Sequence, residues 1–233
     1  NVYSDIQKLI SNSDTIFITT SDEAIIDVWE QIKTLPIKNK LICHCSGSIS
    51  SDIFSNISKY GAYGYSIHPM FAISDKYNSY KDLSKAFFTI EGHEKFTQDF
   101  LEIFNSLGNK AIIISKENKP LYHAAAVTVS NLVSGLINNG ISYLEQCGFS
   151  QEMAIEALYP LIENNITNIK KQGVIKSLTG PVERGDVQTI KNHCDILGED
   201  RELYKMLSKN ILKIAEIKNK KKDYKKIREY LGE

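Results

Sequence analysis

Polar side chains follow three strand-like segments of the sequence at the points where those segments end. They are Thr20-Ser21-Asp22, Ser46-Gly47-Ser48 and His68-Pro69-Met70. In an open parallel sheet the carboxyl ends of the strands meet at one edge, where such proteins bind their ligands. Helix N-termini expected behind Ser21 and Ser46 would suit an anion. The alternative is that Ser21, Asp22 and Ser48 only cap helices, and His68 at a third strand end favours the functional interpretation.

His123 stands in the first turn of a long predicted helix, where the positive end of the helix dipole disfavours an imidazolium. A neutral imidazole acts as an acid or a base near neutral pH. Ser130 and Asn131 follow two helical turns later on roughly the same face, so we expect the three side chains to line one wall. Asn131 costs stability in an apolar helix unless its amide is paired. The alternative for His123 is a partly buried histidine paired with a backbone carbonyl.

The segment Leu178 to Asp186 combines turn formers with a single arginine, Arg184. The planar guanidinium of Arg184 suits a carboxylate or a phosphate. The alternatives are that Arg184 pairs with Glu183 or Asp186, and that Asp186 caps the helix that follows it.

Two kinds of site are not indicated. In Cys43-His44-Cys45 the cysteines face one side of a strand and His44 the other, so the three side chains do not suit one metal ion. No two of the 13 glycines are spaced as in G-x-G, the phosphate-binding motif of a dinucleotide fold. Either the site does not bind a dinucleotide, or its pyrophosphate loop precedes Asn1. Because the sequence opens with Asn1 directly on an expected helix, we expect a missing N-terminal portion.

Alternating strands and helices must position these residues. A short helix is expected at 3–10, and further helices at 23–32, 49–57 and 93–104. Strands are expected at 15–20, 41–45, 62–67, 86–90 and 110–115. This alternation predicts right-handed crossovers and a mainly parallel sheet.

The second half of the chain is predicted to be all helical. Pro120 suits a first helical position, and the expected helices cover 121–146, 150–169, a stretch capped by Asp186, and 199–230, with a loop at 173–185. The predicted domains are therefore residues 1–117 and 118–233.

Composition excludes a global charge field, because 28 basic and 28 acidic residues cancel. We therefore expect a small-molecule substrate, and neither nucleic acid nor a membrane as partner. No run approaches the roughly 20 apolar residues of a membrane span, and no leader is evident. The four cysteines form no disulfide framework. These features predict a cytoplasmic protein with reduced thiols.

Several motifs together resemble a known bacterial family. They are Asp14 to Asp22, His44-Cys45-Ser46-Gly47, Ser66 to Met70, Tyr122 to Asn131, and Leu178 to Asp186 with His193 following. The sequence resembles proteins that join a Rossmann-like domain to domain of unknown function 2520. That family is itself similar to F420-dependent NADP oxidoreductase, pyrroline-carboxylate reductase and 6-phosphogluconate dehydrogenase.

The resemblance implies an α/β fold in which a partial Rossmann-type sheet, without its first βαβ unit, precedes an all-α domain like the C-terminal domain of 6-phosphogluconate dehydrogenase. It also implies NADP or NAD as cofactor, a homodimer formed through the helical domain, and an active site in the cleft between the domains.

We therefore expect an NAD(P)-dependent oxidoreductase that transfers a hydride to or from a small substrate. Cofactor contacts are expected from Thr20, Ser21, Asp22, Ser46 and Gly47. His68 is expected near the nicotinamide, and His123 with Asn131 is expected to handle the proton. Substrate contacts are expected from Arg184, Thr179 and Ser130. The alternatives are a homodimer that binds a nucleotide without catalysis and a purely structural homodimer.

Overall fold

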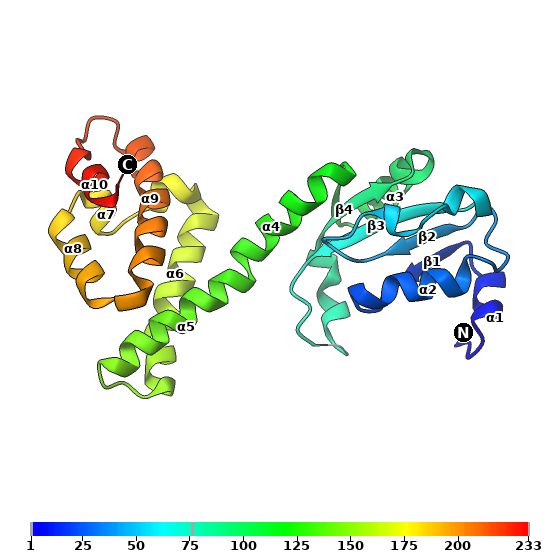
Figure 1. Ribbon diagram of the computed structural model, residues 1–233, viewed down its shortest axis with the longest axis horizontal. Helices are drawn as coiled ribbons and strands as arrows, with labels where there is room; N and C mark the ends of the chain where they lie inside the picture. Colours follow the sequence, from blue (N-terminus) through cyan, green and yellow to red (C-terminus); the bar gives the residue numbers. More distant parts are fainter. Residues whose placement is uncertain (1, 76, 233) are drawn as a thin grey trace. The chain divides into compact units, whose positions relative to one another are not determined.

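The structure is a computed structural model that describes residues 2–75 and 77–232. It divides into two compact units, Asn1–Ile137 and Asn138–Glu233. Figure 1 draws the first unit, which contains the sheet, in blue through green, and the second, all-helical unit in green through red.

A five-stranded sheet forms the centre of the first unit. Its strands, in spatial order, are β1 (Thr15–Ile18), β2 (Leu41–His44), β3 (Tyr63–Met70), β4 (Phe87–Gly92) and β5 (Lys110–Ile113). Strands β1, β2 and β3 are parallel, β4 and β5 are parallel, and β3 and β4 pair antiparallel. The expected mainly parallel sheet is thus confirmed, with one reversal. The described part of the β3–β4 connection holds a 3-10 helix, Ser79–Lys85, and no α-helix of the kind that usually carries a chain back to a parallel position.

Strand β2 and most of β3 are buried on both faces, as their apolar runs indicated, whereas Phe17 of β1 and Ile112 of β5 are exposed. Ile42 packs in one cluster with Trp29 of α2 (Ile25–Ile32), and its neighbour Cys43 packs in another with Phe100 of α3 (Glu94–Ser106). Helices α2 and α3 therefore cover opposite faces of the sheet (Figure 1). A short helix, α1 (Ile6–Ser11), precedes β1 and adds Ile10 to the first cluster.

The helix expected after β2 does not form, and this prediction is wrong. The segment instead makes two short 3-10 turns, Ser51–Ile53 and Ile57–Tyr60, separated by Asn56 in the left-handed region at φ 56°. Backbone amides that would begin a helix are hydrogen-bonded to side chains instead. Glu91 accepts the N–H of Ser51 in this way. Phe54 is buried against Trp29, with ring centroids 5.4 Å apart, so burial rather than helical periodicity explains the apolar pattern.

The long helix expected at 121–146 is interrupted. It consists of α4 (Lys119–Val129) and α5 (Asn131–Gln146), with Ser130 between them at φ −119° and ψ −83°. The Ser130 hydroxyl donates to the Ala126 carbonyl at 2.7 Å, a local bond that competes with helix geometry. The predicted start is confirmed, because Pro120 lies in the first turn of α4.

The stretch Lys116–Gln146 has the length and apolar composition of a membrane span, with a mean hydropathy of 1.2 and none of that window buried. One such helix is weak evidence for a membrane protein. Here it bends at Ser130, and its Lys119 donates hydrogen bonds to Ser46, just after β2, and to Ser66 of β3. The expectation that no membrane is involved stays a prediction.

The second unit contains only helices in its described part. They are the rest of α5, then α6 (Gln151–Ser177), α7 (Pro181–Arg184), α8 (Val187–Ile196), α9 (Arg201–Lys218) and α10 (Lys225–Leu231). Ser150 and Asp186 cap α6 and α8 as predicted. The loop expected at 173–185 is largely wrong, because α6 continues past a kink at Gly173 and α7 fills part of the remainder.

The first compact unit extends beyond the domain boundary predicted after Glu117. It reaches Ile137 because α4 packs its first turn against the sheet, where Lys119 is buried and Tyr122 contacts His68. The four cysteines are free thiols; Cys43 and Cys194 are buried as expected, whereas Cys147 is exposed.

Candidate functional site

The parallel strands β1, β2 and β3 bring their polar ends to one edge of the sheet. Ile18 pairs with His44, so β1 and β2 end level, and His44 pairs with Ser66, from which β3 runs on to Met70. Thr20, Ser21 and Asp22 follow β1 and are exposed there, whereas Ser46 and Gly47 follow β2 and are buried. His68, near the end of β3, is partly buried.

Asp22 and two serines form a hydrogen-bonded group at this edge. The hydroxyls of Ser46 and Ser48 donate to Oδ2 of Asp22 at 2.7 and 3.2 Å. The Ser46 hydroxyl also accepts the backbone N–H groups of Ser48 and Ile49. Neither Ser21 nor Asp22 caps a helix with its side chain, and Ser48 bonds Asp22 instead, so capping alone does not explain these residues. The helix N-terminus expected behind Ser46 is absent, because only 3-10 turns follow it.

His44 supports the turn after β2 from inside the fold. It is fully buried, its Nδ1 accepts the N–H of Ser46, and its Nε2 lies 3.2 Å from the carbonyl oxygen of Ser50. Burial lowers the pKa of His44 to about 4. The sequence analysis assigned His44 no site role, although its place at the end of a buried strand was a usable signal.

The two predicted histidines lie close together. The ring centroids of His68 and His123 are 6.5 Å apart, and Nδ1 of His68 is 2.6 Å from the Tyr122 hydroxyl. Both rings approach Gly47, where a Cβ would lie 2.7 Å from Nδ1 of His123 and 2.9 Å from Nε2 of His68. Within the described residues, Nδ1 of His123 is buried without a hydrogen-bond partner. Burial first, and then the charges of Lys119 and His123, lower the pKa of His68 to about 4, so its imidazole is neutral at pH 7.

Lys119 contacts this group from the buried side, and it was not among the site residues predicted from the sequence. Its side chain is 1% exposed, and its Nζ donates to the Ser66 hydroxyl at 2.6 Å and to the Ser46 carbonyl at 3.2 Å. It forms none of the ion pairs found in the part of the chain that the structure describes. Burial lowers its pKa, and the charges of Glu91 and Asp22 oppose that shift. Its spacing of three and four residues before Tyr122 and His123 was the available signal, because such residues share one helical face.

Four predicted site residues do not lie in this group. Ser130 and Asn131 are exposed at the helix break, where the Ser130 hydroxyl lies 3.0 Å from Oδ1 of Asn131. The apolar surroundings expected for Asn131 are therefore absent from the described chain. Thr179 and Arg184 belong to the helical unit and are exposed. Glu183 pairs with Lys218 and Asp186 caps α8, and Arg184 takes part in none of the ion pairs among the described residues.

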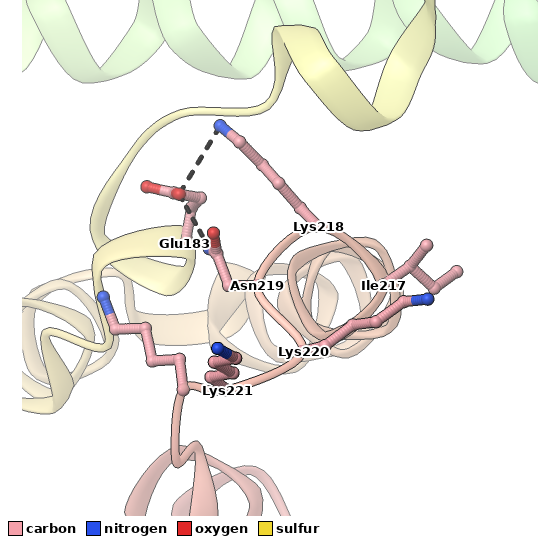
Figure 2. Close-up of a pocket in the computed structure, with 7 residues that line it drawn as sticks. Glu183, Ile217, Lys218, Asn219, Lys220 and Lys221 are labelled. Atoms are coloured by element: carbon pink, nitrogen blue, oxygen red, sulfur yellow. Dashed lines mark hydrogen bonds and ion pairs between the residues drawn. The ribbon is translucent and has the colours of Figure 1, made fainter.

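A pocket of about 600 Å³ lies in the helical unit, and no predicted site residue lines it. It is lined by Glu183, Ile217 and Lys218–Lys222. Figure 2 shows Lys218 pointing toward Glu183 and Lys220 pointing away from it. The Glu183 carboxylate is held by Asn219 at 2.8 Å and by Lys218 at 3.5 Å, so the one acid of the pocket already has partners.

Comparison with known proteins gives one family and many related folds. The family described as domain of unknown function (DUF2520) matches residues 86–211. No curated protein matches the sequence.

Solved structures match most of the chain. Protein TM1727 from Thermotoga maritima is 29% identical, with a TM-score of 0.76 over 89% of this chain and 80% of that one. Protein BF3122 from Bacteroides fragilis is 21% identical, with a TM-score of 0.68 over 86% and 76%. Pyrroline carboxylate reductase from Plasmodium falciparum, solved with NADP bound, is 15% identical, with a TM-score of 0.58 over 94% and 80%. The fold is therefore that of reductases in which a Rossmann-like sheet precedes a helical domain.

Proposed function

Since this chain belongs to the DUF2520 family and shares the fold of NADP-binding reductases, we propose that it is an NAD(P)-dependent oxidoreductase acting on a small substrate. A nicotinamide supplies or accepts a hydride when it is bound. The observation that carries the proposal is the pair His68 and His123 beside the turn at Gly47.

The residues at this edge fit a nicotinamide nucleotide. The buried Nδ1 of His123 lacks a protein partner, and a buried polar atom costs free energy until a ligand or water satisfies it. Asp22 is exposed and uses one oxygen for the two serines, so its other oxygen can accept a ribose hydroxyl. Thr20, Ser21, Ser46 and Gly47 complete the proposed cofactor contacts. No residue of this chain is assigned to the pyrophosphate.

We assign proton handling to the two histidines. His68 is neutral near pH 7 and is oriented by Tyr122, so its Nε2 can hold or release a proton beside Gly47. His123, one helical turn after Lys119, adds a second imidazole at the same point. Asn131 lies outside this group, exposed at the break after α4, and its proposed part in proton handling is only auxiliary.

Substrate recognition is proposed for the predicted polar residues outside this group. Arg184 forms no ion pair within the described residues, so its guanidinium retains donors for an acidic substrate group. Thr179 and Ser130 are proposed to assist.

We further propose that the helical unit forms a homodimer in the cytoplasm. Helix α6 exposes a series of large apolar side chains, which a second copy would cover. They include Tyr159 at 61%, Leu161 at 60% and Ile166 at 59% exposure.

Titration of the full-length protein with NADPH and NADH, followed by fluorescence of the reduced nicotinamide, tests the proposal. We expect saturable binding of at least one nucleotide, and turnover with a member of an imine and carbonyl panel that falls in His68→Ala and His123→Ala. The control is His93→Ala, an exposed cap of α3 outside the site. Absence of binding overturns the proposal. Binding without turnover on any substrate would favour a nucleotide-binding homodimer without catalysis.

A further inference from the structure

His44 is the only fully buried histidine of the described chain and makes two hydrogen bonds of opposite kind. The Ser46 N–H, 3.2 Å away, can only donate, so Nδ1 must accept. The Ser50 carbonyl oxygen, 3.2 Å from Nε2, can only accept, so Nε2 must carry the proton. The two contacts together specify one neutral tautomer.

This one ring holds both ends of the turn from Ser46 to Ser50. Within that turn the Ser46 hydroxyl accepts the amides of Ser48 and Ile49 and donates to Asp22. The turn also brings Gly47 against the rings of His68 and His123. The His44 ring is itself fixed from behind by Phe54, with centroids 5.4 Å apart.

We propose that His44 is a positioning residue, whose Nε2–H tautomer sets the turn that presents Ser46 and Gly47 to the cofactor. It contacts neither cofactor nor substrate. This inference rests on the proposed function for its kinetic consequence, but the tautomer and the rigidity of the turn can be measured without any ligand.

The first experiment uses the wild-type chain alone. Long-range ¹H–¹⁵N correlation spectra of the five histidines should show one ring with an unprotonated Nδ1 and a protonated Nε2 throughout the range of about pH 5 to 8. Its signals should vanish in His44→Asn. A protonated Nδ1 on His44 overturns the proposal, whatever the protein binds.

The second experiment compares three variants. In His44→Asn the side-chain oxygen can replace Nδ1 as acceptor, whereas His44→Leu keeps bulk and loses both bonds. The matched control is His93→Leu, because Nδ1 of His93 also accepts a nearby backbone amide, that of Lys95, but on the surface at α3.

We expect His44→Leu to weaken NADPH binding about tenfold, the equivalent of one lost hydrogen bond, and His44→Asn to recover most of it. Amide hydrogen exchange at Ser46, Ser48 and Ile49 should accelerate in His44→Leu and stay unchanged in the control. A folded His44→Leu protein with wild-type exchange and wild-type affinity overturns the proposal. If the wild-type chain binds no nucleotide, the proposed function fails, and the exchange rates and tautomer still decide the role of His44.

Discussion

The hydroxyl of Tyr122 lies 2.6 Å from Nδ1 of His68, joining the first turn of α4 to the end of β3. Burial raises the pKa of Tyr122, so the phenol is protonated and available to the imidazole at physiological pH. This contact fixes the His68 ring while its Nε2 faces Gly47.

Tyr122→Phe should therefore lower kcat about fivefold with little change in KM, because His68 loses its orienting partner at a cost of about 1 kcal/mol. The helical unit supplies the control, since the Tyr204 hydroxyl lies 2.7 Å from Nδ1 of His193. Tyr204→Phe should cost similar stability without changing kcat. Equal kinetic effects of the two variants would contradict a specific role for Tyr122.

Gly47→Ala should disrupt the histidine pair. The added methyl would stand 2.7 Å from His123 and 2.9 Å from His68, so the rings must move, at a cost of about 1–3 kcal/mol in unfolding free energy. Nucleotide affinity should fall with it. Gly135→Ala is the control, because nothing lies within 4 Å of a Cβ there, and it should be neutral or stabilise α5 by up to about 1 kcal/mol. Urea unfolding of both variants measures these free energies, and a Gly47→Ala protein as stable as wild type would contradict the prediction.

Lys119→Met should alter how stability depends on alkaline pH. Burial lowers the pKa of Lys119 below its ordinary 10.5, so between the two values the unfolded chain binds more protons than the folded one. The contribution of Lys119 to stability therefore rises as pH rises toward 10.5. Urea unfolding at a series of alkaline pH values should show a steeper rise for wild type than for Lys119→Met. Equal slopes of unfolding free energy against pH in the two proteins would contradict a lowered pKa of Lys119 in the folded state.

His44 should make the protein sensitive to mild acid. Its pKa falls from 6.5 to about 4 on folding, so the stabilisation is complete above pH 6.5 and is lost as pH falls toward 4. The full shift is worth about 3 kcal/mol. The charge of Lys119 lowers the pKa of His44 and that of Asp22 raises it, so burial remains the main cause of the shift. Unfolding free energies measured through this window should fall less in His44→Asn than in wild type, and the exposed His93→Asn should behave as wild type does.

Ile166→Glu should dissociate the proposed homodimer. A charge on the apolar face of α6 would have to be buried in the interface, at a cost of several kcal/mol. Light scattering should report the dimer mass for wild type and the monomer mass for the variant. Lys171→Glu, a charge change at an exposed position of the same helix that does not share the face of Ile166, should leave the mass unchanged. A monomeric wild-type chain refutes the homodimer.

Local patterns predicted the strands well and the helices unevenly. The apolar run from Leu41 to Cys43 identifies a strand buried on both faces, because so short an apolar run between turn residues is typical of such a strand. The pattern at Ile53 and Phe54 led to the wrong prediction of an α-helix. Apolar residues of two consecutive 3-10 turns can be buried at the same sequence spacing as those of an α-helix. The break at Ser130 was not predicted. A serine that donates a hydrogen bond to a carbonyl of its own helix does not change the spacing of the apolar residues.

The sequence by itself determined which residues stand at the strand ends, and hence that Asp22, Ser46 and His68 share one edge, because parallel strands of a single sheet must end on the same side. Only the tertiary structure decided what those residues contact. The burial of Lys119 and the two hydrogen bonds of His44 depend on how α4 and the turn after β2 pack over the sheet. Side-chain burial is a property of the whole packed unit, and no local spacing encodes it.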